Sequence, residues 1–184
     1  MTAIRRGWAA DLHHFWFHEL TQADWFRQSD AVDEEVRRRF GHWWQMLSGE
    51  RSESFLDSPR EALAAVLLFD QVPRNVFRND RRAFATDPLA RAITHAALRS
   101  GWDRTLSLPE RQFLYMPLMH SEDIGDQRLS LEMFRRLPRR YGWDFARAHH
   151  RMIARFARFP HRNEVLGRES TAAEVRAVEA GNAW

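Results

Sequence analysis

The stretch from Arg155 to Thr171 carries the densest set of side chains that could do chemistry. A helical pattern breaks in this stretch at Pro160, and a group of polar side chains follows the break: His161, Arg162, Asn163 and Arg168. An imidazole can carry a proton, guanidinium groups hold anions, and an amide can donate or accept a hydrogen bond. Because functional side chains often lie on loops beside rigid elements, we predict a polar site here.

A second polar segment follows an apolar helical stretch and reads Asp70, Gln71, Val72, Pro73, Arg74, Asn75. Asp70 could hold an arginine while Arg74 faces an anion, as in a binding site. The simpler interpretation is a helix that ends before Pro73, with Arg74 near its negative end. Gln71 and Asn75 would then bond the free carbonyl groups. In either case we expect Asp70 to pair directly with an arginine of the segment 155–162.

A third polar segment lies just beyond Pro117, which should kink or end a helix. His120 and Glu122 are two residues apart there, and such a pair could exchange protons or bind a metal ion. The alternative is a helix start, in which Ser121 or Asp123 caps the helix and His120 bonds a backbone carbonyl. The residues leave both interpretations open.

Two further groups of polar side chains lie on predicted helices. His149 shares an apolar face with residues 145–156, which is typical of a core histidine. Beside it runs a stripe of arginines that leads toward Arg162: Arg147, Arg151, Arg155 and Arg158. The stripe is a solvated flank, or, if three of its members meet in one cavity, a phosphate or carboxylate site. His14 and His18 have metal-ligand spacing, but no third ligand is evident and we assign no metal.

Composition excludes several classes of protein. With 184 residues the chain suits a single domain over 1–184, and the absence of Cys excludes disulfides, thiolate nucleophiles and Cys-ligated zinc. All basic residues are Arg, so a pI of about 10.4 coexists with a net charge of only +3 and makes nucleic-acid binding an unlikely function. No secretory signal, membrane span or nucleotide-binding motif is present, and we expect a cytoplasmic protein without a cofactor.

Helix signals recur along the whole chain. Apolar residues repeat at spacings of three and four, and capping boxes open at Ser58, Ser107 and Thr171. These signals predict an all-α array of antiparallel helix hairpins with seven to eight helices.

Three motifs together resemble the bacterial family called domain of unknown function nine-two-four. They are D-Q-x-P-R-N at 70–75, M-P-x-M-H-S-E at 116–122 and R-F-x-R-F-P-H-R-N-x-x-L-G-R-x-S-T at 155–171. The resemblance covers nearly the whole chain and implies a tetratricopeptide-like fold, with no established activity, substrate or cofactor. One departure is Ala157, where the family usually carries Gly. At a mid-helix position we expect this exchange to favour the helix.

Three functions remain open. The first, which we favour, is a helical binding module for a small anionic ligand or a peptide or protein partner. The residues assigned to its pocket are Asp70, Gln71, Arg74, Asn75, His120, Glu122, His149, Arg155, Arg158, His161, Arg162, Asn163 and Arg168. The second is a structural network that fixes how the helices stack. The third is a hydrolase-like enzyme, in which His120, Glu122 and His161 transfer protons and arginines hold an anionic substrate.

Overall fold

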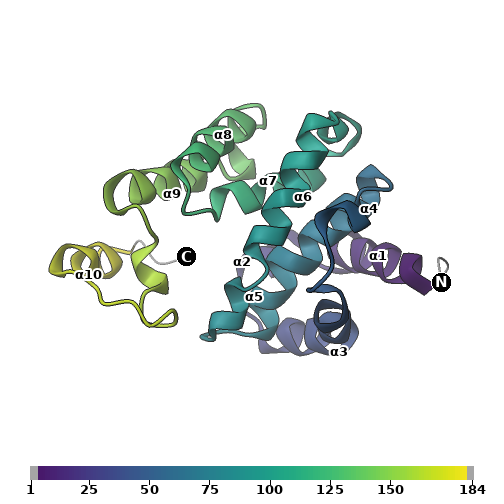
Figure 1. Cartoon of the computed structure of the whole chain (residues 1–184), viewed down its shortest axis with the longest axis horizontal. Helices are drawn as coiled ribbons and strands as arrows, with labels where there is room; N and C mark the ends of the chain where they lie inside the picture. Colours follow the sequence, from purple (N-terminus) through teal and green to yellow (C-terminus); the bar gives the residue numbers. More distant parts are fainter. Residues whose placement is uncertain (1–3, 182–184) are drawn as a thin grey trace.

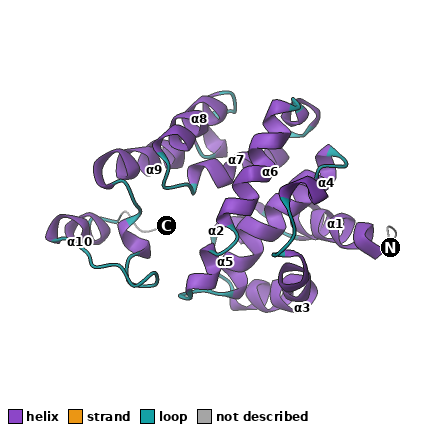
Figure 2. Cartoon of the chain, in the orientation of Figure 1, coloured by secondary structure: helices purple, strands orange, loops and turns teal. Residues whose placement is uncertain are grey.

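The computed structural model describes residues 4–181, which contain helices and loops and no strand (Figures 1 and 2). The predicted all-α class is therefore confirmed. The helices are α1 (Ile4–His14), α2 (Gln22–Phe26), α3 (Asp30–Leu47), α4 (Pro59–Val66), α5 (Val72–Val76), α6 (Asp87–Arg99), α7 (Leu108–Met119), α8 (Ile124–Arg135), α9 (Trp143–Phe156) and α10 (Ala172–Glu179). Because α4 and α5 are one continuous helix, the described residues form nine helices, of which eight have seven or more residues.

Side chains fix the starts of several helices. Ser58 accepts a hydrogen bond from the backbone of Glu61 at the start of α4, and full capping boxes open α7 at Ser107 and α10 at Thr171. Asp123 caps α8 by accepting from the backbone of Asp126. All three predicted capping boxes thus start a helix, because each supplies acceptors for the unpaired N–H groups of the first turn.

The helix that contains Pro73 does not end before it, contrary to the prediction. A π-helical turn, Leu67–Gln71, joins α4 to α5, and Pro73 lies in the first turn of α5. A proline has no N–H for the carbonyl four residues earlier, which is that of Phe69. The hydroxyl of Thr86 donates to this carbonyl at 2.7 Å, and Thr86 in turn accepts from the indole of Trp44 at 2.9 Å. The π-turn and Thr86 together let the chain remain helical through the proline.

Helix α7 also continues through its proline. It passes Pro117 and ends two residues later at Met119, so of the two predicted effects of this proline, a kink or an end of the helix, the end at the proline is wrong. Every side chain from Gln112 to Met119 is buried. Burial of this whole segment in the core holds the helix together where the proline removes a backbone hydrogen bond.

The central helix of the structure is α4, whose residues from Ala62 onward are fully buried. It contacts α1, α6 and α7, while α3 packs on α5, and α8 packs between α7 and α9. One large apolar core runs through these helices, and its buried aromatic side chains include Trp8, Trp16, Phe40 and Phe113. Figure 1 shows α1 and α10 at opposite ends of the long axis. None of the described helices is both long and apolar enough to cross a membrane.

The C-terminal segment, residues 157–181, follows the end of α9. Ala157 has a left-handed backbone, with φ of 56°, and its N–H bonds the carbonyl of Ile153 to close α9. The expectation that an alanine at this position favours the helix is wrong, because the position ends the helix and suits glycine. A small second core, formed by Met152, Ile153, Phe159 and Ala177, joins this segment to α9.

Candidate functional site

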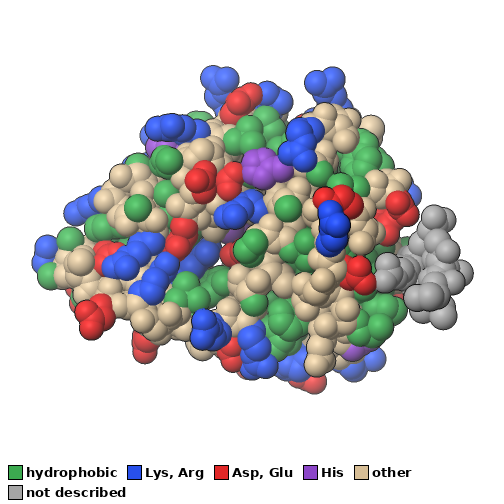
Figure 3. All heavy atoms as spheres, viewed as in Figure 1, with side chains coloured by type: hydrophobic (Ala, Val, Ile, Leu, Met, Phe, Trp, Pro, Cys, Tyr) green, Lys and Arg blue, Asp and Glu red, His purple; other side chains and the backbone are tan. Residues whose placement is uncertain are grey.

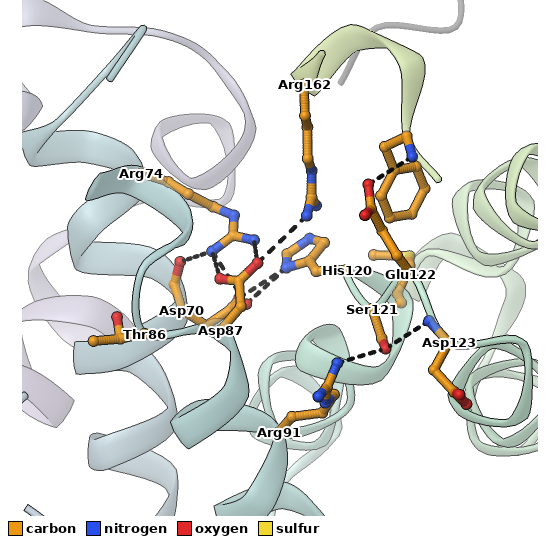
Figure 4. A network of polar contacts seen from close by, with 12 residues as sticks. Asp70, Arg74, Thr86, Asp87, Arg91, His120, Ser121, Glu122, Asp123 and Arg162 are labelled. Carbon is orange, nitrogen blue, oxygen red and sulfur yellow. Dashed lines mark hydrogen bonds and ion pairs between the residues drawn. The ribbon is translucent and has the colours of Figure 1, made fainter. Parts of the chain in front are cut away.

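Charged side chains from distant parts of the chain meet beside the C-terminal segment (Figure 4). We call this set the polar network, and it consists of Asp70, Arg74, Asp87, His120, Glu122, Arg162 and Arg168. The π-turn and α5 supply its first two members, and the first residue of α6 supplies Asp87. The loop between α7 and α8 supplies His120 and Glu122, and the part of the C-terminal segment before α10 supplies Arg162 and Arg168. The network therefore connects the C-terminal segment to the main body of helices.

Asp70 is fully buried and is the most heavily bonded carboxylate of the network. It accepts a hydrogen bond from Nδ1 of His120 at 2.8 Å and from Nε2 of Gln71 at 2.6 Å. The guanidinium of Arg74 lies 3.3 Å from it, one helical turn along the chain. Burial opposes ionisation of Asp70, but the charges of Arg74 and His120 prevail and hold the pKa of this carboxyl well below its usual range.

The arginine that pairs with Asp70 is not in the segment 155–162, so that prediction is wrong. Arg74 occupies this role and also binds Asp87 through two hydrogen bonds of 2.8 and 2.9 Å. Arg162 instead reaches Asp87, with Nη1 3.4 Å from Oδ2 (Figure 4). Arg74 pairs with Asp70 because the two residues lie one turn apart on the same helix, where their side chains are neighbours.

Arg162 is the least satisfied member of the polar network. Its side chain is 6% exposed, and its guanidinium lies between the rings of Phe84 and Phe159, 4.5 Å from each centroid. Its single contact with Asp87 is long, and its Nε atom has no hydrogen-bond partner in the described part of the chain. Burial, followed by repulsion from Arg74, lowers the pKa of Arg162 to about 10. The guanidinium of Arg162 is thus a buried cation with fewer hydrogen bonds than it can make.

Glu122 belongs to a separate ion pair within the network. Arg168 binds it through two hydrogen bonds of 2.7 and 2.9 Å, and the backbone N–H of Phe159 donates to it at 2.7 Å. Burial opposes its ionisation, but these bonds lower the pKa of Glu122 below its usual value. The ring of His120 bonds Asp70 rather than Glu122, so the described structure does not show the proposed His120–Glu122 pair.

Three imidazoles lie along one side of the polar network. The rings of His120 and His149 are 6.2 Å apart, and Phe159 lies 5.3 Å from His149 and 5.6 Å from His161. His149 is buried, and its Nδ1–H donates to the carbonyl of Phe145 at 2.8 Å, as expected for a core histidine. Burial is the main cause that lowers the pKa of His149 to about 3 and of His161 to about 4, and it also lowers the pKa of His120. All three rings are therefore neutral near neutral pH.

Several residues assigned to the pocket lie outside the network. Arg158 binds Glu174 of α10 through two hydrogen bonds of 2.6 and 2.9 Å, and the amide of Asn163 donates to Ser170 at 3.0 Å. Arg155 lies over the ring of Phe156. Asn75 donates to the carbonyl of Gln71 at 3.0 Å, as predicted, but the side chain of Gln71 bonds Asp70 rather than a backbone carbonyl. These contacts shape α5 and the C-terminal segment rather than the centre of the network.

No group of three His, Cys, Asp or Glu residues in the described structure could hold a metal ion. The rings of His14 and His18 are stacked, with centroids 5.3 Å apart and planes 24° apart. Stacked rings direct their nitrogen atoms alongside one another, which does not make a chelating pair.

A neighbouring cluster contains a serine, an aspartate and a histidine but lacks the geometry of a nucleophile. Ser121 donates to Asp126 at 2.7 Å, and Nε2 of His95 lies 2.7 Å from the other oxygen of Asp126. The carboxylate, rather than the imidazole, therefore faces the serine hydroxyl. Arg91 donates to the same hydroxyl at 3.0 Å (Figure 4), so the cluster joins α6 to α8.

Two members of the site were not predicted from the sequence. Neither Asp87 nor Phe84 was assigned to the site from the sequence, yet Asp87 binds Arg74 and Arg162, and the ring of Phe84 lies against the guanidinium of Arg162. The signal that could have found them is the sequence Ala83-Phe84-Ala85-Thr86-Asp87, which also contains the hydroxyl that bonds Phe69.

Residues 12–182 match the family model described as "Bacterial protein of unknown function (DUF924)". The chain belongs to this family. Among solved structures, the DUF924 chain is similar to "Structure of Protein of Unknown Function ATU0120 from Agrobacterium tumefaciens". The two chains are 36% identical in sequence and superpose with a TM-score of 0.88, over 94% of the DUF924 chain and 97% of the Agrobacterium tumefaciens chain. No curated protein matches the chain. The resemblance inferred from the three motifs is thus confirmed, and the DUF924 family description leaves the activity open.

Proposed function

We propose that this protein is a helical binding module whose polar network accepts a small anion, with Arg162 as the principal donor. The observation that carries the proposal is the state of this guanidinium. Arg162 is 6% exposed, its guanidinium lies 4.5 Å from the centroids of two phenyl rings, and its one hydrogen bond within the described residues, at 3.4 Å, is to a carboxylate that Arg74 already binds twice. A carboxylate or phosphate group at Arg162 would supply the hydrogen bonds that it lacks.

The imidazoles of His120 and His161 lie partly buried beside Arg162 and make the site sensitive to a bound anion. Because the Nδ1–H of His120 donates to Asp70, its Nε2 accepts a hydrogen bond from a protonated ligand oxygen, or donates one after the ring gains a proton. Because their pKa values are lowered, the positive charge near neutral pH comes from arginine. Added salt should therefore weaken binding, and a bound anion should raise the pKa values of these imidazoles.

The test is a titration of sulfate, phosphate and citrate, followed by NMR of the backbone amides of residues 161–163 and of the His120 ring. Arg162→Gln should lower the affinity about tenfold or more, as expected for the loss of a charge-assisted bond. Arg158→Gln is the matched control, because Arg158 binds Glu174 outside the network, and it should leave the affinity unchanged. Anion affinity that is equal in both variants would reject the proposal and favour a purely structural network.

A second candidate function is proton transfer at His120, and one contact favours it. The carboxylate of Asp70 accepts the Nδ1–H of this imidazole, which leaves Nε2 as the basic atom. Such a hydrolase-like site would use Arg162 to hold an anionic substrate. The polar network also supports the structural alternative, because most of its charges are paired with each other.

We also propose that the helices stack as tetratricopeptide-like hairpins. Consecutive helices α6, α7, α8 and α9 each pack on the next, which supports this arrangement. A location in the cytoplasm belongs to the same proposal, supported by the absence of Cys.

A further inference from the structure

A groove lies between α9 and α10, on a part of the C-terminal end that the polar network does not use. It has a volume of about 650 Å³. The residues that line it are Ala148, His150, Arg151, Met152, Ala154, Arg155, Ala173, Arg176, Ala177 and Ala180. Four of the α9 residues follow the spacing of zero, three, four and seven, and so do the three α10 residues together with Ala180, which caps the end of α10. Each helix therefore presents one continuous face to the groove.

The floor of this groove is apolar and made of small side chains. Met152 and Ala177 are buried and belong to the second core, whereas the alanines along the walls are half-buried or exposed. Alanine methyl groups project little from a helix, so another backbone can approach closely. A floor of this kind suits apolar side chains more than a sugar–phosphate chain.

The rims of the groove are basic. Arg151 and Arg155 of α9 and Arg176 of α10 are exposed, and no residue that lines the groove is acidic. None of these arginines makes a hydrogen bond or an ion pair within residues 4–181, although Arg155 lies over the ring of Phe156. Asp144 is close enough for an electrostatic interaction with Arg151, but its two hydrogen bonds, of 2.8 and 2.9 Å, are with Arg139.

The groove arginines have no carboxylate partner among the described residues. Some other exposed arginines, such as Arg38, Arg82 and Arg139, each bind a carboxylate of their own chain. Figure 3 shows arginine side chains gathered over the end of the molecule formed by α9 and α10. Three guanidinium groups on the rims of one groove, without a carboxylate among its lining residues, are complementary to negative charge.

We propose that this groove, the arginine groove, binds an acidic amphipathic helix of a partner protein. The partner's apolar face would pack on Met152 and the alanines, and its carboxylates would bond Arg151, Arg155 and Arg176. Each of the two helices presents a row of side chains at helical spacing to the groove, so a third helix can pack between them. The inference is independent of the anion site at Arg162, because the residues of the two sites do not overlap.

The probe is a fluorescein-labelled peptide of about 16 residues with the repeat Leu-Ala-Glu-Glu, which spans about 24 Å as a helix. Its binding to the full chain is measured by fluorescence anisotropy at low and at physiological salt. The peptide with Lys in place of Glu should not bind. The double variant Arg155→Ala with Arg176→Ala should lose about tenfold or more in affinity for the acidic peptide.

Two controls separate the groove from general charge. Arg99→Ala with Arg128→Ala removes the same charge from exposed positions on α6 and α8 and should leave the affinity unchanged. Ala173→Phe fills the groove without changing its charge and should abolish binding while the circular dichroism spectrum stays helical. No binding to the full chain, or equal loss in both double variants, would overturn the proposal. Tighter binding of duplex DNA or of phosphatidylglycerol vesicles through the same arginines would also overturn it.

Discussion

His120 donates its Nδ1–H to the buried carboxylate of Asp70, 50 residues earlier in the chain, at 2.8 Å. This bond ties the end of α7 to the π-turn of the central helix. It also fixes which imidazole nitrogen is free for other partners, because a carboxylate can only accept at Nδ1. The carboxylate and the imidazole are therefore one unit, both in the stability of the fold and in any chemistry of the network.

Replacement of Asp70 by Ala should lower the free energy of unfolding by about 3–5 kcal/mol, because it removes a buried carboxylate that pairs with the guanidinium of Arg74. Denaturant titration measures the change. The control is Glu132→Ala, which removes an exposed carboxylate from its pair with Arg136 and should cost less than about 1 kcal/mol. Equal costs in the two variants would show that the burial of Asp70 has no energetic consequence.

The free energy of unfolding should fall as the pH falls from about 7 to 5. Burial lowers the pKa of His149 from 6.5 to about 3, so the unfolded chain binds more protons than the folded chain in this range. For this one residue the loss is about 2 kcal/mol. His149→Gln should remove that part of the pH dependence, whereas His42→Gln, at an exposed position, should not. Chemical denaturation at several pH values measures both, and parallel pH profiles for wild type and His149→Gln would contradict the prediction.

Thr86→Val should lower the free energy of unfolding by about 1–3 kcal/mol, because it leaves the carbonyl of Phe69 and the indole of Trp44 without their bonds to the hydroxyl. Thr86→Ser keeps the hydroxyl and should therefore retain most of the stability that Thr86→Val loses. Thermal or denaturant unfolding of the two variants gives the comparison. A serine variant as unstable as the valine variant would assign the effect to the methyl group instead.

Ala157→Gly should raise the free energy of unfolding by about 1 kcal/mol, since glycine adopts the left-handed backbone of this position without steric cost. The matched control is Ala154→Gly, one turn earlier in α9, which should lower it by about 0.5–1 kcal/mol. Opposite signs in the two variants are the expected result. A loss of stability in both would mean that strain at Ala157 is absent.

Features set by local sequence were predictable, whereas pairings across the fold were not. The capping residues Ser58, Ser107 and Thr171 marked helix starts, because a cap depends on residues within four positions. The helical stretch through Pro73 was missed, because the hydroxyl that makes it possible comes from Thr86. The partner of Arg162 was missed for the same reason, since Asp87 is 75 residues away and resembled a simple helix start.

The π-turn Leu67–Gln71 makes the central helix respond differently to the loss and to the gain of a residue. A π-turn contains one residue more than an α-helical turn needs. Deletion of one apolar residue within the turn would convert it to regular α-helix with the same number of turns, so α5 would keep its orientation and Arg74 would still face Asp87. One further residue inserted into α4 would instead rotate α5 by about 100° and point Arg74 away from Asp87, so this segment should tolerate a deletion better than an insertion.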